Sequence, residues 1–509
     1  MTTSHVRSLV AVLLLFAAIP LMVSDHLPLH DYPNHLARLH MLMHWHDQPV
    51  YRLHYELGNF LIPNIAMDVV MLGLATVVPL ELSGRIFIWL TLVLTLTGVV
   101  ALHRALFGKP SVVPLVAALF LYNGVLAWGF INYLFGIGVL LWALALYIRL
   151  RSSPWQIPLA SILALLLFFS HFVAFGLYGL AVGGYELQRA WADSTSIRNR
   201  LSRLCLAGLQ FVVPVVLLFL SRTSQEHSSF RFDYSPLQKI EFLVRTFATY
   251  SVAAELLLVT FVIVSLGLIF TRRLAITINP LFNFPLILTI LAFLLLPFSF
   301  FGSLFLDARI PICIVFLAIA ASNARFASPK VERVFALGLI AVAILRFGAI
   351  SLQWHQSDDR FDTAIQMFDQ LQPNDVLITA ASPATTISAK LDKWQSPVVF
   401  VAAYATIMRG TFVPSIFADP RHQPVYVAPP LKGLYEYQNQ LPKIIKTQED
   451  FRILVADLQQ FRKLGDTFYV LLLNCDQIKI RDEPTFRRVR DNHRECIFRL
   501  AMDQLSTQK

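Results

Sequence analysis

Apolar runs separated by short polar gaps fill the chain as far as about residue 352. Eleven of these runs predict membrane-spanning helices, although several fall short of the roughly 20 residues that an upright helix needs to cross a bilayer. They cover approximately residues 6–23, 85–103, 111–128, 130–149, 156–171, 172–188, 204–220, 250–270, 282–299, 308–323 and 334–352. The first run ends without a small-residue cleavage motif, so we interpret it as an uncleaved span rather than a signal peptide.

A further apolar stretch, residues 61–80, is left out of the spans because of the charge distribution. With it omitted, the gaps that fall on one side of the membrane are basic and almost free of acid, at 104–109, 149–151, 189–203, 272–273 and 325–333. The opposite gaps near 129, 172 and 300 contain no Lys or Arg. This asymmetry predicts a cytoplasmic N-terminus and an outer first loop at 24–84, with an embedded interface helix that contains Asp68.

Residues 353–509 are richer in charge and follow the last span on the outer side. Periodicity predicts helices at 361–371 and 449–461, and strands at 375–380 and 467–473. The alternation indicates a small extracytoplasmic α/β domain. Its two cysteines, Cys475 and Cys496, lie in or beside strand-like runs, and an outer compartment permits oxidation, so we predict a disulfide between them.

Composition agrees with this fold class, a mostly α polytopic membrane protein with a domain at 1–352 and a second domain at 353–509. Of the 509 residues, 56% are hydrophobic and only 15% are charged, which excludes a disordered, fibrous or disulfide-rich secreted chain. The net charge of +10 is explained by membrane orientation, so no nucleic-acid partner is expected. The predicted location is the cytoplasmic (inner) membrane.

Familiar soluble catalytic motifs are absent, and polar residues instead gather on the predicted outer side. Asp31 stands at the mouth of a helix expected to run to about Trp45, directly after the first span. One interpretation is that Asp31 is only a helix N-cap, supported by Pro33. The other is a carboxylate that takes a proton from an acceptor hydroxyl. The two interpretations are compatible, because an N-cap residue is held in a fixed position from which it can also act as a base.

A metal hypothesis arises from the histidines between residues 24 and 60. His40 and His44 are one helical turn apart, as metal ligands often are. Histidines at a membrane interface more often bind phosphate, water or backbone, and so we assign no metal ligand. A divalent cation held by Asp31 and a substrate phosphate stays open as an alternative.

Further candidates lie at the outer ends of later spans. Asp307 and Arg309 face the outer mouth of a helix, either as a mutual ion pair or as binding residues for a lipid phosphate. His171 lies where two short spans turn back, either as a structural residue or as a substrate contact. The loop 221–250 is unusually polar, which indicates either a solvated surface or a lid.

The order of these features resembles the GT-C superfamily of integral membrane glycosyltransferases. Asp31-Tyr-Pro-Asn-His35-Leu-Ala-Arg38 is similar to the first-loop pattern Asp-Glu-x-x-(Tyr/His)-Ala-x-x-Ala of that family. Tyr32 replaces a second acid, which puts a two-carboxylate metal site in doubt. Residues 61–80 resemble the embedded helix of the family, and Arg309-Ile-Pro resembles an arginine at the start of a late span.

The resemblance implies an inverting sugar transfer at the outer face of the membrane. The donor would be a polyprenyl-phosphate-linked sugar and the acceptor a polysaccharide, a lipid or a protein. Asp31 would be the catalytic base, and Arg309, with His35 or His171, would stabilise the departing lipid phosphate. Asp307 would complete the substrate-binding set.

Two alternatives belong to other functional classes. A transporter or flippase of lipid-linked or polar solutes usually shows an internal repeat and polar groups near the membrane midplane, and neither is evident here. A non-catalytic scaffold in cell-envelope assembly would use Asp31 only as a cap. The three functions predict different sites. An enzyme brings the outer polar residues Asp31, His35, His171 and Arg309 to one outer cavity, a transporter has its site near the membrane midplane, and a scaffold has no such site.

Overall fold

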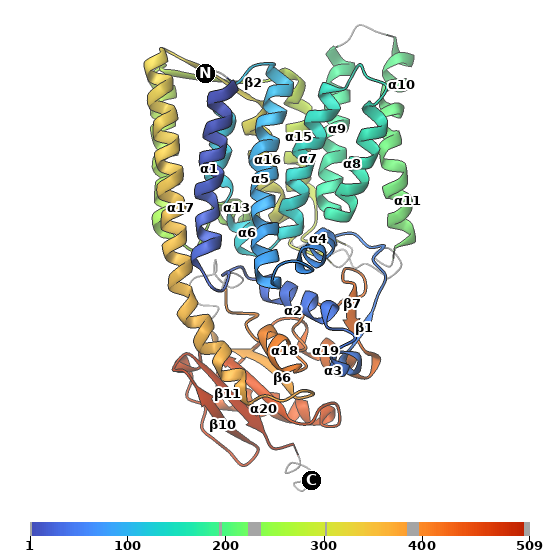
Figure 1. Cartoon of the computed structure of the whole chain (residues 1–509), viewed down its shortest axis with the longest axis vertical. Helices are drawn as coiled ribbons and strands as arrows, with labels where there is room; N and C mark the ends of the chain where they lie inside the picture. Colours follow the sequence, from blue (N-terminus) through green and yellow to red (C-terminus); the bar gives the residue numbers. More distant parts are fainter. Residues whose placement is uncertain (1–2, 193–195, 222–235, 301–302, 384–396, 503–509) are drawn as a thin grey trace. The chain divides into compact units, whose positions relative to one another are not determined.

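The computed structural model describes residues 3–192, 196–221, 236–300, 303–383 and 397–502, and the chain divides into two compact units (Figure 1). The helical unit comprises Met1–Ser24, Phe60–Val70 and Leu82–His355. The sheet unit comprises Asp25–Asn59, Met71–Glu81 and Gln356–Lys509.

Six helices in the described part of the chain are long and apolar enough to cross a membrane. They are α1 (Thr3–Val23), α5 (Leu80–Phe107), α7 (Ile131–Arg149), the continuous stretch Ile197–Leu220, α14 (Val252–Phe270) and α17 (Pro329–Gln366) with its short extension. The stretch Ile197–Leu220 is built from α10 (Ile197–Gly208), η2 (Leu209–Phe211) and α11 (Val212–Leu220). The protein is therefore a mostly helical, multi-pass membrane protein.

Helices also occupy the remaining predicted spans. They are α6 (Gly124–Ala127) with the 3-10 helix η1 (Val113–Phe120), α8 (Gln156–Ser170), α9 (Phe172–Ala192), α15 (Asn283–Leu295) with η3 (Pro280–Phe282), and α16 (Ile310–Ala321) with η4 (Asp307–Arg309). Length and composition support six spans among the described residues, so the count of eleven stays a prediction.

Other elements of the helical unit are short. Helix α13 (Pro236–Arg245) precedes α14. The strand pairs, none of which the sequence predicted, are β2 (Leu274–Ile278) with β5 (Ser322–Phe326) and β3 (Ser299–Phe300) with β4 (Ser303–Leu304).

The stretch 61–80, predicted as an interface helix, contains α4 (Ala66–Ala75). Its ten residues extend about 15 Å, half the thickness of a bilayer core, so α4 does not span. Hydrogen bonds attach the chain just before α4 to the helices around it. The amide of Ile65 donates to the carbonyl of Phe169 at 2.9 Å, and the side chain of Asn132 bonds the carbonyl of Asn64 and the amide of Met67 at 2.6 and 2.7 Å.

Helix α7 forms the core of the helical unit, and Figure 1 shows it running beside α5, α8 and α9. Glycines permit the close approach to α5. A Cβ on Gly138 would lie 2.7 Å from Cβ of Leu94, and one on Gly98 would lie 2.8 Å from Cβ of Leu141. Small residues at such crossings allow two helix backbones to approach closely. Close packing matters in a membrane because lipid is as apolar as the helix surfaces, so burial of apolar area does not by itself hold helices together.

An arginine is buried inside the predicted last span. Arg346 of α17 is 1% exposed and donates hydrogen bonds to the carbonyls of Ala254 and Tyr122. A buried intramembrane charge needs such partners because lipid offers none. Arg346 therefore joins α17 to the start of α14 and to the chain before α6.

The sheet unit is built around a five-stranded sheet with the order β10-β11-β9-β6-β8. Strand β6 is parallel to β9 and β8, whereas β11 is antiparallel to β9 and β10. The strands are β6 (Val376–Ala381), β8 (Lys443–Ile444), β9 (Phe468–Leu473), β10 (Phe486–Asp491) and β11 (Glu495–Leu500). The helices after the membrane region are α18 (Ala403–Arg409), α19 (Lys432–Gln438) and α20 (Gln448–Leu458), with η5 (Met367–Gln370), η7 (Pro429–Leu431), η8 (Gln459–Phe461) and η9 (Cys475–Gln477).

Both strands and the later helix predicted in this region are confirmed, as β6, β9 and α20 with η8. The predicted separate helix at 361–371 is instead the end of α17 followed by η5. No Gly or Pro interrupts the chain between residues 352 and 366, so nothing in the local sequence stops the helix.

Residues 25–59 of the sheet unit form α2 (Tyr32–Met43), α3 (Pro49–His54) and β1 (Tyr55–Leu57). Strand β1 pairs antiparallel with β7 (Val425–Val427), which aligns Tyr55 with Val427. The first loop and the C-terminal region are thus parts of one folded body.

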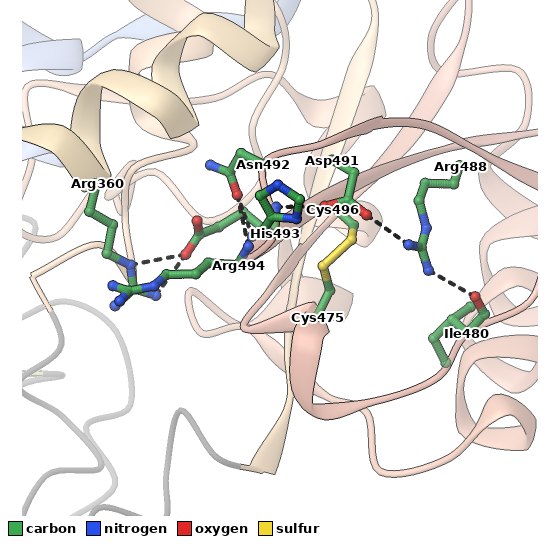
Figure 2. Close-up of a disulfide and its surroundings, with 10 residues drawn as sticks. Arg360, Cys475, Ile480, Arg488, Asp491, Asn492, His493, Arg494 and Cys496 are labelled. Carbon is green, nitrogen blue, oxygen red and sulfur yellow. Dashed lines mark hydrogen bonds and ion pairs between the residues drawn. A yellow bond between two sulfur atoms is a disulfide. The ribbon is translucent and has the colours of Figure 1, made fainter.

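The predicted disulfide between Cys475 and Cys496 is present and joins the end of β9 to β11 (Figure 2). Nearby, Arg360 of α17 donates to the buried carboxylate of Glu495 at 2.6 Å and to Oδ1 of Asn474 at 2.7 Å. These contacts hold the end of α17 against the sheet.

Candidate functional site

Three helices of the helical unit begin at one place. Phe130, His171 and Arg309 directly precede α7, α9 and α16, respectively. The guanidinium carbon of Arg309 lies 4.0 Å from the ring centroid of Phe130, and Nη1 lies 2.7 Å from Nε2 of His171. The structure therefore brings together two residues that the sequence analysis named separately, His171 and Arg309.

The His171 ring has more donors around it than it can satisfy. Arginine is a hydrogen-bond donor only, so Nε2 of His171 faces a donor in Arg309. The backbone N–H of Val173 points at Nδ1 of the same ring at 3.1 Å. A neutral imidazole has one acceptor nitrogen, so only one of these two N–H groups can donate to the ring at a time. Nη2 of Arg309 donates to the carbonyl of Leu304 at 3.3 Å.

The elements around this pair fix its position. The hydroxyl of Tyr133 donates to the backbone carbonyl of Arg309 at 2.8 Å, and its ring packs edge-on against His171 with centroids 5.3 Å apart. A Cβ on Gly136 would lie 2.8 Å from Cβ of Ala174 and 3.5 Å from Cβ of His171. Gly136 therefore allows α7 to approach the turn that carries His171.

The electrostatics of this place favour an anion. Helix N-termini carry partial positive charge, and α7, α9 and α16 start here. The Arg309 side chain adds a full charge and is 8% exposed. A planar guanidinium also matches the oxygen geometry of a phosphate. We call Phe130, Tyr133, His171 and Arg309 the arginine site.

Asp307, the third predicted residue of this region, pairs with a lysine. Oδ2 of Asp307 lies 2.5 Å from Nζ of Lys239 on α13, and Oδ1 accepts from the amide of Ala308 at 3.0 Å. Lys239 also donates to the carbonyls of Phe293 and Leu296 at 3.0 and 3.1 Å. The carboxylate therefore neutralises Lys239 and anchors α13 beside the arginine site. Most of the predicted lid, residues 222–235, lies outside the described residues.

Asp31 and His35 belong to the sheet unit and lie on α2. Asp31 is 8% exposed and occupies the N-cap position, as predicted. Its side chain, however, accepts no capping hydrogen bond from α2, a helix that is described throughout. Nδ1 of His35 lies 3.1 Å from Nη2 of Arg38.

Two buried polar residues on the same helix were missed as candidates, Asn34 and Arg38, which are 0% and 1% exposed. Together with Asp31 and His35 they occupy positions i, i+3, i+4 and i+7, which share one face of a helix. We call these four residues the polar face of α2. This spacing was readable in the sequence, since polar residues at apolar-stripe positions signal a buried polar face.

The histidines of the first loop have structural contacts. Nδ1 of His40 lies 3.0 Å from the hydroxyl of Tyr51, which donates to the carbonyl of Thr406. Burial, with a smaller contribution from His44, lowers the pKa of His40 to about 4. The one cluster with metal-ligand spacing among the described residues is Cys475, Asp491 and Cys496, and its two sulfurs form the disulfide.

The fold is similar to that of ArnT, a GT-C glycosyltransferase, which confirms at the level of the fold the resemblance stated from the sequence. A similar solved structure is ArnT from Cupriavidus metallidurans bound to undecaprenyl phosphate, with 13% identity, a TM-score of 0.52 and 98% of each chain covered. ArnT in the apo state matches with 14% identity, the same TM-score and the same coverage. No family model and no curated protein matches the chain.

Proposed function

We propose that this protein is a membrane glycosyltransferase that transfers a sugar from a polyprenyl-phosphate-linked donor to an acceptor. The observation that carries the proposal is the arginine site, a buried Arg309 at the start of three helices in a chain with the fold of ArnT. ArnT has been crystallised with undecaprenyl phosphate, and a lipid phosphate has the charge and geometry that the arginine site favours.

In this proposal the arginine site binds the phosphate that leaves. Arg309 donates to the phosphate oxygens, and the positive helix ends stabilise the charge that grows on the phosphate as the bond to the sugar breaks. Asp307 contributes indirectly, through its ion pair with Lys239.

Asp31 acts as the catalytic base. The acceptor hydroxyl oxygen attacks the anomeric carbon, the bond from that carbon to the phosphate oxygen breaks, and the hydroxyl proton passes to the Asp31 carboxylate. Attack opposite the leaving group inverts the anomeric centre. The absence of a capping bond from α2 to this carboxylate supports the assignment, because the side chain is not needed to start the helix. His35 lies one turn away and contributes to donor or acceptor binding.

The proposed organisation follows the sequence. Eleven spans place the N-terminus in the cytoplasm, and residues 24–84 and 353–509 on the outer side of the cytoplasmic membrane. The domain 1–352 performs the transfer, and the α/β domain at 353–509 shapes the acceptor region. The acceptor is a polysaccharide, a lipid or a protein of the envelope. In the alternative, a divalent cation held by Asp31 and the donor phosphate neutralises the charge of the leaving phosphate.

The test compares lipid extracts of membranes from cells with and without the protein. A glycosyltransferase consumes its donor, so cells lacking the protein, or carrying Asp31→Asn, should accumulate one polyprenyl-phosphate-linked sugar relative to wild type. Mass spectrometry identifies the sugar. Identical lipid-linked sugar pools in all three strains would contradict the proposal.

A further inference from the structure

Asn34 on the polar face of α2 is buried in an unusual state. Its side chain is 0% exposed, and neither Oδ1 nor Nδ2 has a hydrogen-bond partner within the part of the chain that the structure describes. Buried polar side-chain atoms are almost always paired, because leaving them unpaired forfeits the hydrogen bonds that water supplied in the unfolded chain. A partner for either end of this amide therefore has to come from beyond the described residues.

Asn132 shows what a structural asparagine looks like in the same protein. Its Nδ2 donates to the carbonyl of Asn64 at 2.6 Å, and its Oδ1 accepts from the amide of Met67 at 2.7 Å. Both residues are buried, yet only one of the two amides is satisfied by the protein. Burial alone does not explain the state of Asn34.

Position connects Asn34 to the proposed chemistry. Asp31 precedes it by three residues and Arg38 follows it by four, so the three side chains share one face of α2. A ligand group that reaches the Asp31 carboxylate is therefore one helical turn or less from the Asn34 amide.

The two ends of the amide define the chemistry of that ligand. Nδ2 donates and Oδ1 accepts, so the ligand must supply both an acceptor and a donor. An ionised phosphate has acceptors only and leaves Oδ1 unsatisfied. A hydroxyl both donates and accepts, and neighbouring hydroxyls on a sugar ring present the two functions side by side.

We propose that Asn34 binds the sugar ring of the donor, with Oδ1 accepting from one hydroxyl and Nδ2 donating to the next. This inference rests on the proposed function and names the part of the donor that contacts Asn34. Asn34 is thereby a specificity-determining residue.

The experiment uses the purified full-length chain and two kinds of probe. One probe is undecaprenyl phosphate without a sugar, and the other is undecaprenyl phosphate carrying glucose, galactose, mannose or N-acetylglucosamine. Affinities are measured for wild type, Asn34→Leu and the matched control Asn132→Leu, together with the thermal unfolding midpoint of each. Leucine has the same branched arrangement of four side-chain heavy atoms as asparagine and makes no hydrogen bond.

We expect wild type to bind one sugar-bearing lipid at least tenfold more tightly than the bare lipid. Asn34→Leu should abolish this preference and leave the affinity for the bare lipid within twofold of wild type. Its unfolding midpoint should equal or exceed that of wild type, because the variant removes two unsatisfied groups. Asn132→Leu should lower the midpoint.

Two results would overturn the inference in distinguishable ways. If Asn34→Leu keeps the sugar preference, or if wild type shows none while still binding the bare lipid, Asn34 does not read the sugar and the proposed function is unaffected. If wild type binds neither bare nor sugar-bearing lipid, the proposed function and this inference both fail. A second variant, Asn34→Asp, keeps Oδ1 as an acceptor and should lose the preference only in part.

Discussion

Arg309 and His171 are separated by 138 positions in the sequence, yet Nη1 of Arg309 lies 2.7 Å from Nε2 of His171. The contact depends on the turn between α8 and α9 and on the start of α16, and each residue is the last before a helix. A cation placed at the starts of α7, α9 and α16 adds a full positive charge to the partial positive charge of the helix ends.

Arg309→Lys should therefore separate phosphate binding from folding. Lysine keeps the charge but loses the planar fork and the stacking on Phe130, so we expect the affinity for undecaprenyl phosphate to fall at least tenfold, equivalent to about 1.4 kcal/mol. The unfolding midpoint should change little. Arg346→Lys is the matched control, because Arg346 is also buried but bonds to the backbone carbonyls of Ala254 and Tyr122. Its variant should lower the midpoint and leave the lipid affinity unchanged.

Asp31→Asn should remove the base without removing the start of α2. No side-chain cap is present to lose, and asparagine has the same shape, so the unfolding midpoint should stay near that of wild type. Loss of a general base typically slows transfer by about 10² to 10⁴. The measurement is the rate of donor consumption in membranes. Asp47→Asn, at an exposed carboxylate after the same helix, is the control and should retain the wild-type rate. Full activity of Asp31→Asn would show that Asp31 is not the catalytic base.

The sequence predicted much of this fold, because its signals are local. Apolar runs, the positive-inside asymmetry and turn residues identified the helices, the short α4 and the strands β6 and β9. Other predicted spans, such as α8 with 15 residues and α15 with 13, fall short of the roughly 20 residues that an upright membrane-crossing helix needs, so length does not confirm them. Arg346 was overlooked because one charge hardly changes the mean hydropathy of a span.

The site was predicted only in part for a different reason. His171 and Arg309 were selected as polar residues at span ends, but their contact is tertiary and no sequence spacing encodes it. The ion pair of Asp307 with Lys239 of α13 is also a tertiary contact, so the sequence does not indicate which residue pairs with Asp307. Asn34 and Arg38 share the helical spacing of Asp31 and His35, but the sequence does not show that these two polar side chains are buried.

Breaking the ion pair between Asp307 and Lys239 should destabilise the protein more than removing it altogether. In Asp307→Asn, Lys239 keeps its charge at a buried position, and such losses typically amount to about 3 to 5 kcal/mol. In the double variant Asp307→Leu with Lys239→Met no charge is left unpaired, and much of the stability should return. Chemical denaturation of the purified protein measures both. Equal stability of the single and double variants would show that the pair is not coupled.

Stability of the sheet unit should fall in mild acid because of His40. The pKa of His40 is lowered to about 4, against 6.5 for an unperturbed histidine, chiefly by burial. The unfolded chain therefore binds more protons between pH 6.5 and 4, so stability decreases as the pH falls through this window, by at most about 1.4 kcal/mol per pH unit. Thermal unfolding of His40→Asn should show a flatter pH dependence, whereas His493→Asn, at an exposed histidine, should behave as wild type.

Membrane orientation is tested with single cysteines and an impermeant thiol reagent. The variants Gln48→Cys and Thr447→Cys should react in intact cells, because both positions lie in predicted outer regions. Cysteines at Ser196 and Ser328 should react only after the membrane is opened. Labelling of Ser196→Cys from outside would show that residues 61–80 cross the membrane and would reverse the orientation of every later loop.

The pairing of β1 with β7 sets an order of events during biosynthesis. Tyr55 leaves the ribosome about 370 residues before its strand partner Val427, and at roughly 5 to 20 residues per second this interval lasts tens of seconds. Throughout that time the membrane helices are being inserted while the segment with Asp31 lacks its partner strand. The sheet unit can be completed only when the C-terminal region has been delivered to the same compartment. A nascent chain that stops after α17 is therefore expected to carry the first loop unfolded, exposed to envelope proteases and chaperones.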